Sequence, residues 1–314
     1  MTPPWDRHGP LSTYAWREGG VKPPHSKAPS AQAFSEQEGV VADLNPQAKQ
    51  MADESMVRNL AAQAQAIWPQ EAPLFQRYKL PAEPQVLDAG CGTGEISERL
   101  AALFPRARVL GVDIIDHHLE LARSRSASLA PRLRFEHQSV FELDAPDHSF
   151  DLTVCRHVIH SIPHADRVLA ELARVTRPGG YLHLIPEDYG MIHFQAGALD
   201  PRDFWHETLR PFAAATGTDL FIGRNTFRIL AGMNLQAITM DYVVVDTIRV
   251  PREVFAAIIE AWRDGYSEAI GELTPVTRAR ARAYFDQMIA NIRDPKGYAV
   301  WMVPVMSARL PPEG

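Results

Sequence analysis

The sequence predicts an α/β protein whose sheet of seven strands, mostly parallel, carries helices on both faces. Short apolar runs alternate with amphipathic segments between residues 84 and 187, and strands separated by helices form parallel sheets. A glycine-rich turn at 90–94 joins one apolar run directly to a helix. A final apolar run at 298–306 is expected to return to the sheet as its antiparallel last strand.

The N-terminal part is expected to form two segments outside the sheet. Residues 1–45 are rich in proline, which removes backbone donors, so they are predicted to be either a disordered tail or a lid that folds over a ligand. Residues 46–80 are predicted to be accessory helices. Apolar residues at helical spacing indicate one helix over 47–68 that Pro69 ends, and a short second helix over 72–78.

The core of the fold is expected over residues 81–187. Its strands read as nearly continuous apolar runs, which is typical of parallel strands that helices cover on both faces. The predicted strands are 85–89, 108–113, 133–137, 150–155 and 181–186, and the predicted helices are 95–104, 116–128 and 165–175.

The alternation pauses after the fifth strand. Residues 188–235 are predicted to be a helical cap insertion, which includes a helix at 222–233 and would form a lid with the N-terminal helices. Residues 236–314 are then expected to complete the core sheet. Their predicted elements are strands at 238–248 and 298–306 and two helices near 252–270 and 275–292.

Composition excludes several classes of protein. The formal net charge of −6 disfavours nucleic acid as a partner, because a surface that follows phosphates needs clustered Lys and Arg. No apolar run approaches the length that spans a membrane, and no signal peptide is recognisable, so a cytoplasmic protein is expected. The two cysteines, Cys91 and Cys155, are read as small apolar fillers rather than as a disulfide or a nucleophile.

The glycine turn indicates a ligand rather than a simple turn. Its third glycine, Gly94, comes one position too early for the dinucleotide pattern G-x-G-x-x-G, and the Lys-Ser/Thr ending of a P-loop is absent. The second predicted strand ends in Asp113, 23 residues beyond Gly90, where a carboxylate can accept both hydroxyls of a ribose. The two features together predict a nucleoside ligand with no phosphate site.

Five ordered segments carry a resemblance to a known family. These are VLDAGCGTGEIS, RVLGVD, QSV, FDLTVCRHVIHSI and LARVTRPGGYLHLI, in which Pro-Gly-Gly forms a turn into the fifth strand. With this spacing the chain resembles the class I S-adenosylmethionine-dependent methyltransferases of the small-molecule type, closely over residues 84–187 and in general layout elsewhere. The resemblance implies a Rossmann-like fold and S-adenosylmethionine as cofactor.

The resemblance also implies positions for the cofactor. The glycine loop and the end of the fourth strand would hold the methionine part, Asp113 the ribose, and the next two segments the adenine. The implied residues are Asp88, Gly90, Cys91, Gly92, Gly94, Arg156 and His157 for methionine, Ile114 against adenine, and Ser139 and Val140 at the adenine edge.

Polar residues after the fourth and fifth strands are the candidates for catalysis and acceptor binding. His160 is a candidate general base, since a neutral nucleophile can need one. With His157 and His164 it could also suggest a metal, but too few ligands are evident and no metal is expected. The alternative is that these are helix-start and loop histidines without a role in catalysis or metal binding. Open α/β sheets place ligands after the strands, so the candidate substrate contacts are Glu187, Tyr189, His193 and Trp205.

The function predicted is transfer of a methyl group from S-adenosylmethionine to O, N or C of a small-molecule acceptor. The activated sulfonium leaves the protein mainly to align the reactants. One alternative is non-methylating chemistry on the same fold, such as an intramolecular cyclisation that releases methylthioadenosine. A second is a binder without catalysis. The oligomeric state stays open.

Overall fold

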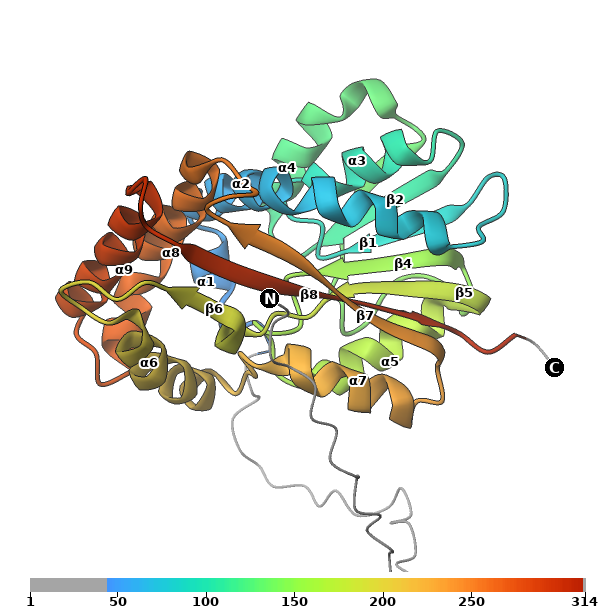
Figure 1. Ribbon diagram of the computed structural model, residues 1–314. Coiled ribbons are helices and arrows are strands. Elements are labelled where there is room, and N and C mark those ends of the chain that lie inside the picture. The colour runs from blue at the N-terminus through green and yellow to red at the C-terminus, as the bar shows by residue number, and fades with distance from the viewer. Residues whose placement is uncertain (1–43, 313–314) are drawn as a thin grey trace, which may run out of the picture. The chain divides into compact units, whose positions relative to one another are not determined.

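The computed structural model describes residues 44–312, so the predicted proline-rich segment lies almost entirely outside the described residues. The described chain forms an eight-stranded sheet with the order β3-β2-β1-β4-β5-β8-β6, and β7 lies along the other edge of β8 (Figure 1). The strands are β1 (Gln85–Ala89), β2 (Arg108–Asp113), β3 (Leu133–His137), β4 (Phe150–Arg156), β5 (Thr176–Ile185), β6 (Ile192–Phe194), β7 (Gln236–Asp246) and β8 (Ala299–Arg309).

The first five strands are parallel, and β8 is antiparallel to its three neighbours, as predicted. β5 and β6 pair with the same edge of β8 at different positions along the strand. β5 pairs with Met306–Arg309, and β6 pairs with Ala299–Trp301. The other edge of β8 pairs with β7 over almost its whole length. This single long strand therefore joins the parallel part of the sheet to the rest of the protein.

Helices cover both faces of the sheet (Figure 1). On one face lie α2 (Glu54–Glu71), α3 (Glu95–Leu103) and α4 (Asp116–Arg125), and on the other lie α5 (Ala165–Val175) and α7 (Ile222–Gly232). Alternate residues of one strand feed two separate cores, since Val86 packs among the first set and Leu87 among the second. The parallel strands are thus buried on both faces, which is why they read as continuous apolar runs.

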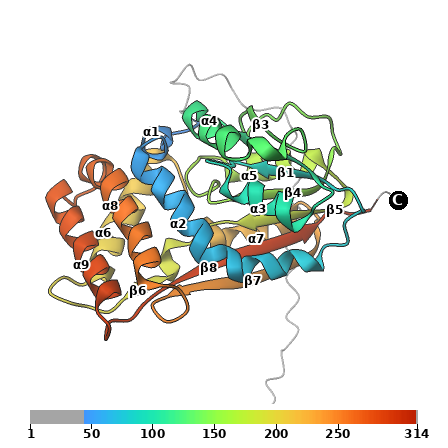
Figure 2. The same ribbon diagram turned by 90° about the horizontal axis from the view of Figure 1, so that it is seen from above.

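A third apolar core lies at the end of the sheet formed by β6, β7 and β8, whose buried residues contribute to it. It gathers α6 (Pro201–Thr216), α8 (Arg252–Leu273), α9 (Arg278–Arg293), β6 and part of α2 around large buried side chains such as Phe204 and Trp301. Figure 2 shows these three helices grouped at the end of the molecule where α1 (Ala48–Met51) also lies. We call this group the helical lobe.

The apolar cores group the elements of residues 188–314 differently from the predicted division of the chain, which stays a prediction. Residues 188–235 contribute to two cores, because α7 packs on the sheet whereas β6 and α6 belong to the core of the helical lobe. The lobe also takes α8 and α9 from the segment 236–314, which was predicted as part of the core sheet. α6, α8 and α9 bury their apolar side chains in one shared core. The sequence of each helix does not show which other helices it packs against.

Two boundaries in the N-terminal helices were wrong. The predicted helix 47–68 is two helices, because the Asp53 side chain accepts from the Ser55 N–H at 2.8 Å and caps a new start. Its second part continues past Pro69 to Glu71. Glu71 is completely buried in contact with Arg156, so a tertiary contact outweighs the backbone bond that proline removes. The predicted helix 72–78 is a 3₁₀ helix over Ala72–Arg77.

The sheet has one strand more than the seven predicted. The added strand, β6, is only three residues long and lies in a segment expected to be helical. It forms because it pairs with β8, a contact that the local sequence does not indicate. β5 begins at Thr176, before the Pro-Gly-Gly segment predicted as a turn, with an irregularity in its pairing to β4. Within residues 44–312, no helix combines the length and the apolar character needed to cross a membrane.

Candidate functional site

A pocket of about 710 Å³ opens at the carboxyl ends of β1, β2 and β4. The sheet side of its wall includes Gly90, Gly92 and Asp113, and the loop after β4 adds His157 and Val158. The opposite side comes from the N-terminal helices; its residues are Asn45, Gln47, Ala48, Met51 and Leu60. We call this the nucleoside pocket.

The glycine loop brings backbone to the pocket where side chains would block it. Gly90 and Gly92 have φ angles of +76° and +52°, a region in which L side chains are strained. A Cβ on Gly90 would overlap Val158, and one on Gly92 would lie 2.7 Å from Leu60 Cδ1. The loop is anchored to β2, because the N–H groups of Gly90 and Cys91 both donate to the Val112 carbonyl, at 2.8 and 2.9 Å.

Asp113 connects this loop to the next helix. Its Oδ2 accepts from the Gly92 N–H at 2.8 Å and its Oδ1 from the Ile115 N–H at 3.0 Å. Each carboxylate oxygen has further lone pairs, so Asp113 can also accept from a ligand while it holds the loop. Ile114 and Val140 give the same pocket two apolar contacts.

A smaller compartment of about 360 Å³ adjoins the other side of the glycine loop, and we call it the polar compartment. Asp88 and Arg156 both line it. The Arg156 Nε donates to Glu71 Oε1 at 2.8 Å, while its Nη2 is buried and has no partner among residues 44–312. The hydroxyl of Thr93 is a second buried polar group of this compartment without a partner in the described chain. The compartment therefore offers an unused cationic donor beside a carboxylate.

The carboxylate of Asp88 is held in an unfavourable environment. It is 2% exposed, and its Oδ2 accepts from the Ser97 hydroxyl at 2.6 Å. Burial raises the pKa of Asp88 from 3.8 to about 6, although the Ser97 hydrogen bond and the Arg156 charge oppose the rise. A cationic ligand group beside it would relieve this cost.

Asp88→Asn should remove a pH dependence from the stability of the protein. Because the folded protein holds the Asp88 proton more tightly, this group favours folding below pH 3.8, and the contribution disappears as pH rises through about 6. The shift corresponds to roughly 3 kcal/mol. Urea unfolding at pH 4 and pH 8 measures the effect. Between these two pH values the stability of the variant relative to wild type should rise by about 2.4 kcal/mol, most of the full amount. An equal difference at the two pH values would contradict the pKa of Asp88.

His157 is fixed by a buried acid. Its Nδ1 hydrogen-bonds to Glu187 Oε1, and its backbone has a φ of +56°. A non-glycine residue in this region is a local strain that the surrounding contacts must hold. The His157 Nε2 and the Glu187 Oε2 are buried without partners in the described part of the chain. His157 lines both the nucleoside pocket and the polar compartment, so a buried acid orients a ring at their junction.

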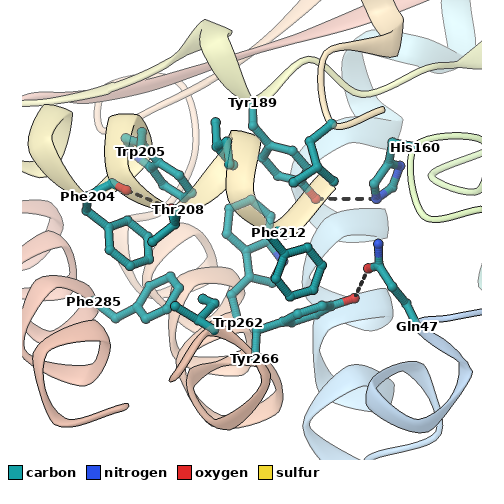
Figure 3. A pocket seen from close by; sticks show the side chains of 13 residues that line it. Gln47, His160, Tyr189, Phe204, Trp205, Thr208, Phe212, Trp262, Tyr266 and Phe285 are labelled. Atoms are coloured by element: carbon teal, nitrogen blue, oxygen red, sulfur yellow. Dashed lines mark hydrogen bonds between the residues drawn. The ribbon is translucent and has the colours of Figure 1, made fainter. Parts of the chain in front are cut away.

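A third cavity, of about 520 Å³, lies between the loop after β4 and the helical lobe (Figure 3). We call it the aromatic chamber. Tyr189, Trp205, Trp262 and other rings line it, and His160 lies at one end with the Tyr189 hydroxyl 3.4 Å from its Nε2. Burial lowers the pKa of His160 to about 4, even though the nearby Glu187 charge favours protonation. His160 is therefore a neutral imidazole at pH 7.

The structure gathers most of the predicted site residues. Eight of them line the nucleoside pocket or the polar compartment, and they are Asp88, Gly90, Cys91, Gly92, Asp113, Ile114, Val140 and Arg156, with His157 between the two. His160, Tyr189 and Trp205 line the aromatic chamber. Among the described residues no group of three or more His, Cys, Asp or Glu side chains could hold a metal ion.

Four predicted residues are placed elsewhere. Gly94 is the N-cap of α3, packed against Ala122. The Ser139 hydroxyl accepts from the Phe141 N–H at 3.3 Å and lines none of the three cavities, and Glu187 is turned to His157 instead. His193 is exposed on β6, because the strand alternation that buries its neighbours points it outward, and it lines none of the three cavities.

Sequence reasoning missed residues that the accessory helices bring in. Gln47 lines both the nucleoside pocket and the aromatic chamber, and Leu60 faces the glycine loop. Leu60 has the helical spacing of the other apolar residues of α2. This periodicity predicts packing of the helix and does not indicate a contact with the pocket. His118 lines the nucleoside pocket from α4; it is 1% exposed, and its Nε2 has no partner in the described residues. The sequence signal for His118 is only its position five residues after Asp113, in the first turn of the next helix.

Comparisons with known proteins place the glycine loop in a family. Residues 86–180 match the methyltransferase domain family. The chain is 40% identical over 105 residues to a trans-aconitate 2-methyltransferase of Deinococcus radiodurans. The aligned segment covers 33% of this chain and 38% of that protein. The chain is 37% identical over 107 residues to the 27-O-demethylrifamycin SV methyltransferase of Amycolatopsis mediterranei, covering 33% and 39% of the two chains. The chain spans less than half the length of these curated relatives.

Solved structures extend the likeness of the fold to most of the chain. The [4+2]-cyclase SpnF is 18% identical with a TM-score of 0.55, covering 88% of this chain and 100% of that one. Phosphoethanolamine N-methyltransferase 2 of Haemonchus contortus, solved with S-adenosyl-L-methionine, is 17% identical with a TM-score of 0.52, covering 84% and 60%. At this identity the structures show the fold alone.

The glycine loop, the acidic end of β2 and the strand order define a class I S-adenosylmethionine-dependent methyltransferase domain, and S-adenosylmethionine is the cofactor of that class. Residues 86–180 are the part of this chain that matches the methyltransferase domain family. It ends within β5, so β7, β8 and the whole helical lobe lie outside the part that the family defines.

Proposed function

We propose that the protein is a methyltransferase that moves a methyl group from S-adenosylmethionine to a small-molecule acceptor. The observation that carries this proposal is the pair of compartments on either side of the glycine loop. One has Asp113 and apolar contacts suited to a nucleoside, and the other has Asp88 and Arg156, suited to an amino acid zwitterion. S-adenosylmethionine combines these two chemical parts in one molecule.

The residues of both compartments fit the cofactor. The unpartnered Nη2 of Arg156 can donate to the carboxylate of the methionine part, and the buried Asp88 carboxylate can accept from its ammonium group. Asp113 would bind the ribose hydroxyls, while Ile114 and Val140 would contact the adenine. Gly94 and Ser139 do not line these compartments and have no part in this assignment.

When bound, S-adenosylmethionine would supply a methyl group that its sulfonium already activates for transfer to the acceptor. The protein then needs to align the acceptor and to take up the proton that an O–H or N–H acceptor loses. His160 is the proposed base. It is neutral at pH 7, and its Nδ1 is buried with no partner among the described residues.

The acceptor is not carried over from the relatives. Trans-aconitate and a demethylrifamycin appear in the names of two proteins whose likeness to this chain is limited to about a third of its length. The family match, residues 86–180, holds the glycine loop, whereas the residues of the aromatic chamber come mainly from the helical lobe. Incubation with S-adenosylmethionine and candidate acceptors tests the reaction: S-adenosylhomocysteine supports methyl transfer, and methylthioadenosine formed without an acceptor supports the cyclisation alternative.

Asp113→Ala should weaken binding of S-adenosylhomocysteine by about 2–3 kcal/mol, because it removes charge-assisted hydrogen bonds to the ribose and frees the Gly92 loop. Isothermal titration calorimetry should show a Kd higher by roughly 30- to 150-fold. Asp116→Ala is the matched control, since Asp116 is exposed and pairs with His137 outside the pocket. Equal affinity of the Asp113 variant and wild type would refute the ribose assignment.

A further inference from the structure

The aromatic chamber has the position expected of an acceptor site. Gln47 lines both the chamber and the nucleoside pocket, so the two cavities meet at this side chain. The loop after β4 does the same from the other side, because Val158 and Ser161 line the nucleoside pocket and His160 lines the chamber. A molecule in the chamber therefore has one end beside the nucleoside pocket and the other among the helices of the lobe.

The walls of the chamber carry no counter-charge. Thirteen residues line it, and none of them is Asp, Glu, Lys or Arg. Its rings come mainly from α6, α8 and α9, as Figure 3 shows, and they include Trp205, Phe212, Trp262, Tyr266 and Phe285. A charged group moved from water into such a wall would lose its hydration and find no partner.

Two polar side-chain atoms of the chamber are hydrogen-bond donors without an acceptor among the described residues. Gln47 Oε1 accepts from the Tyr266 hydroxyl at 3.0 Å, which leaves the Gln47 Nε2 as a donor. Figure 3 shows this amide on the side of the chamber that faces the Tyr189–His160 pair. Neither Gln47 Nε2 nor Trp205 Nε1 has a partner within residues 44–312, and both are buried. Two buried N–H donors fit a ligand with oxygen atoms and oppose an ammonium group.

His160 adds the complementary group. With its proton on Nε2, toward the Tyr189 oxygen, its Nδ1 is an acceptor that has no partner in the described structure. Gln47 and His160 lie at the same end of the chamber (Figure 3), so the oxygen of a ligand hydroxyl placed there can accept from the Gln47 amide. The end of the chamber nearest the nucleoside pocket is therefore built to hold a hydroxyl.

We infer that the acceptor is an uncharged, largely apolar ring compound that presents a hydroxyl group at the Gln47–His160 end of the aromatic chamber. This rests on the proposed function, because it takes the chamber as the acceptor site. It excludes carboxylate, phosphate and ammonium acceptors from that site. Rings of the ligand would pack against the aromatic side chains of α6 and α8.

Binding of three matched probes tests the charge class. The full chain, saturated with S-adenosylhomocysteine, is titrated by calorimetry at pH 7.5 with 2-naphthol, 2-naphthoate and 2-naphthylmethylamine. The neutral naphthol should bind at least about tenfold more tightly than either charged analogue. A charged probe that binds as tightly, or no binding of naphthol, overturns the inference. Failure of S-adenosylhomocysteine itself to bind would instead contradict the proposed function, so the two failures are distinguishable.

A single isosteric change locates the probe. Gln47→Glu keeps the hydrogen bond from Tyr266 and places a carboxylate at the proposed hydroxyl site, so it should raise the affinity of 2-naphthylmethylamine about tenfold and lower that of 2-naphthol. Gln65→Glu makes the same charge change at an exposed position of α2 and should alter neither affinity. If Gln47→Glu leaves both affinities unchanged, the naphthol binds outside the chamber and the inference fails.

Discussion

Gly92→Val should abolish binding of S-adenosylmethionine while the protein still folds. The valine would have to adopt a φ of +52°, which a β-branched residue tolerates poorly, and its Cβ would lie 2.7 Å from Leu60 Cδ1. Its methyl groups would enter the nucleoside pocket, and the strained loop would lose the Gly92 N–H to Asp113 hydrogen bond. We expect affinity for S-adenosylhomocysteine to fall by more than about 100-fold, measured by calorimetry.

Two further variants separate this effect from general damage. Gly232→Val is the matched control, because a Cβ at Gly232 would meet no heavy atom within 4 Å and its φ is not positive. It should bind the cofactor as wild type does. Gly92→Ala combined with Leu60→Ala removes the clash but keeps the strained φ, so it should bind with intermediate affinity. Wild-type affinity in Gly92→Val would refute the close approach of backbone and ligand.

Arg156→Met should cost about 3–5 kcal/mol in the free energy of unfolding, because it leaves the fully buried Glu71 without its cation. Burial opposes the charge on Glu71, but the Arg156 charge and a hydrogen bond from His183 Nε2 at 3.0 Å bring its pKa down to about 2. The His183 ring is held in turn by the Tyr78 hydroxyl, 2.6 Å from its Nδ1. Urea unfolding at pH 7 measures the loss.

The double variant Glu71→Gln/Arg156→Met distinguishes stability from ligand binding. It removes the uncompensated charge, so it should regain most of the stability that Arg156→Met loses. Neither variant has the guanidinium nitrogen that faces the polar compartment, so both should bind S-adenosylhomocysteine weakly. If the double variant is no more stable than Arg156→Met, the stabilising role of the buried ion pair is wrong.

The parallel half of the fold could be predicted from the sequence because its signals are local. β1 and β2 have the predicted bounds, 85–89 and 108–113, since each is an apolar run ended by a chemically distinct residue. The glycine loop could be interpreted for a related reason: three positive-φ positions need three glycines. Asp113 then follows at the same edge of the sheet by the order of the strands.

The helical lobe could not be predicted, because its contacts join segments far apart in the chain. The chamber places Gln47 beside Tyr266, and no local pattern links the start of α1 to the middle of α8. Its position after β5 makes Trp205 a candidate substrate contact, but in the sequence alone core packing explains it equally well. The structure places it in the wall of the aromatic chamber, opposite residues of α8 and α9. His193 shows the reverse case, since a three-residue strand turned a plausible contact outward.

The shared edge of β8 has a consequence for how the protein is made. β5, β6 and β7 all leave the ribosome before β8, and each of them pairs with it. Until β8 is synthesised these strands present unpaired backbone groups, and the helical lobe has no Trp301 around which to pack. The nascent chain therefore passes through a stage in which a nearly complete cofactor domain carries open strand edges, and this is the stage at which chaperones would protect it from aggregation.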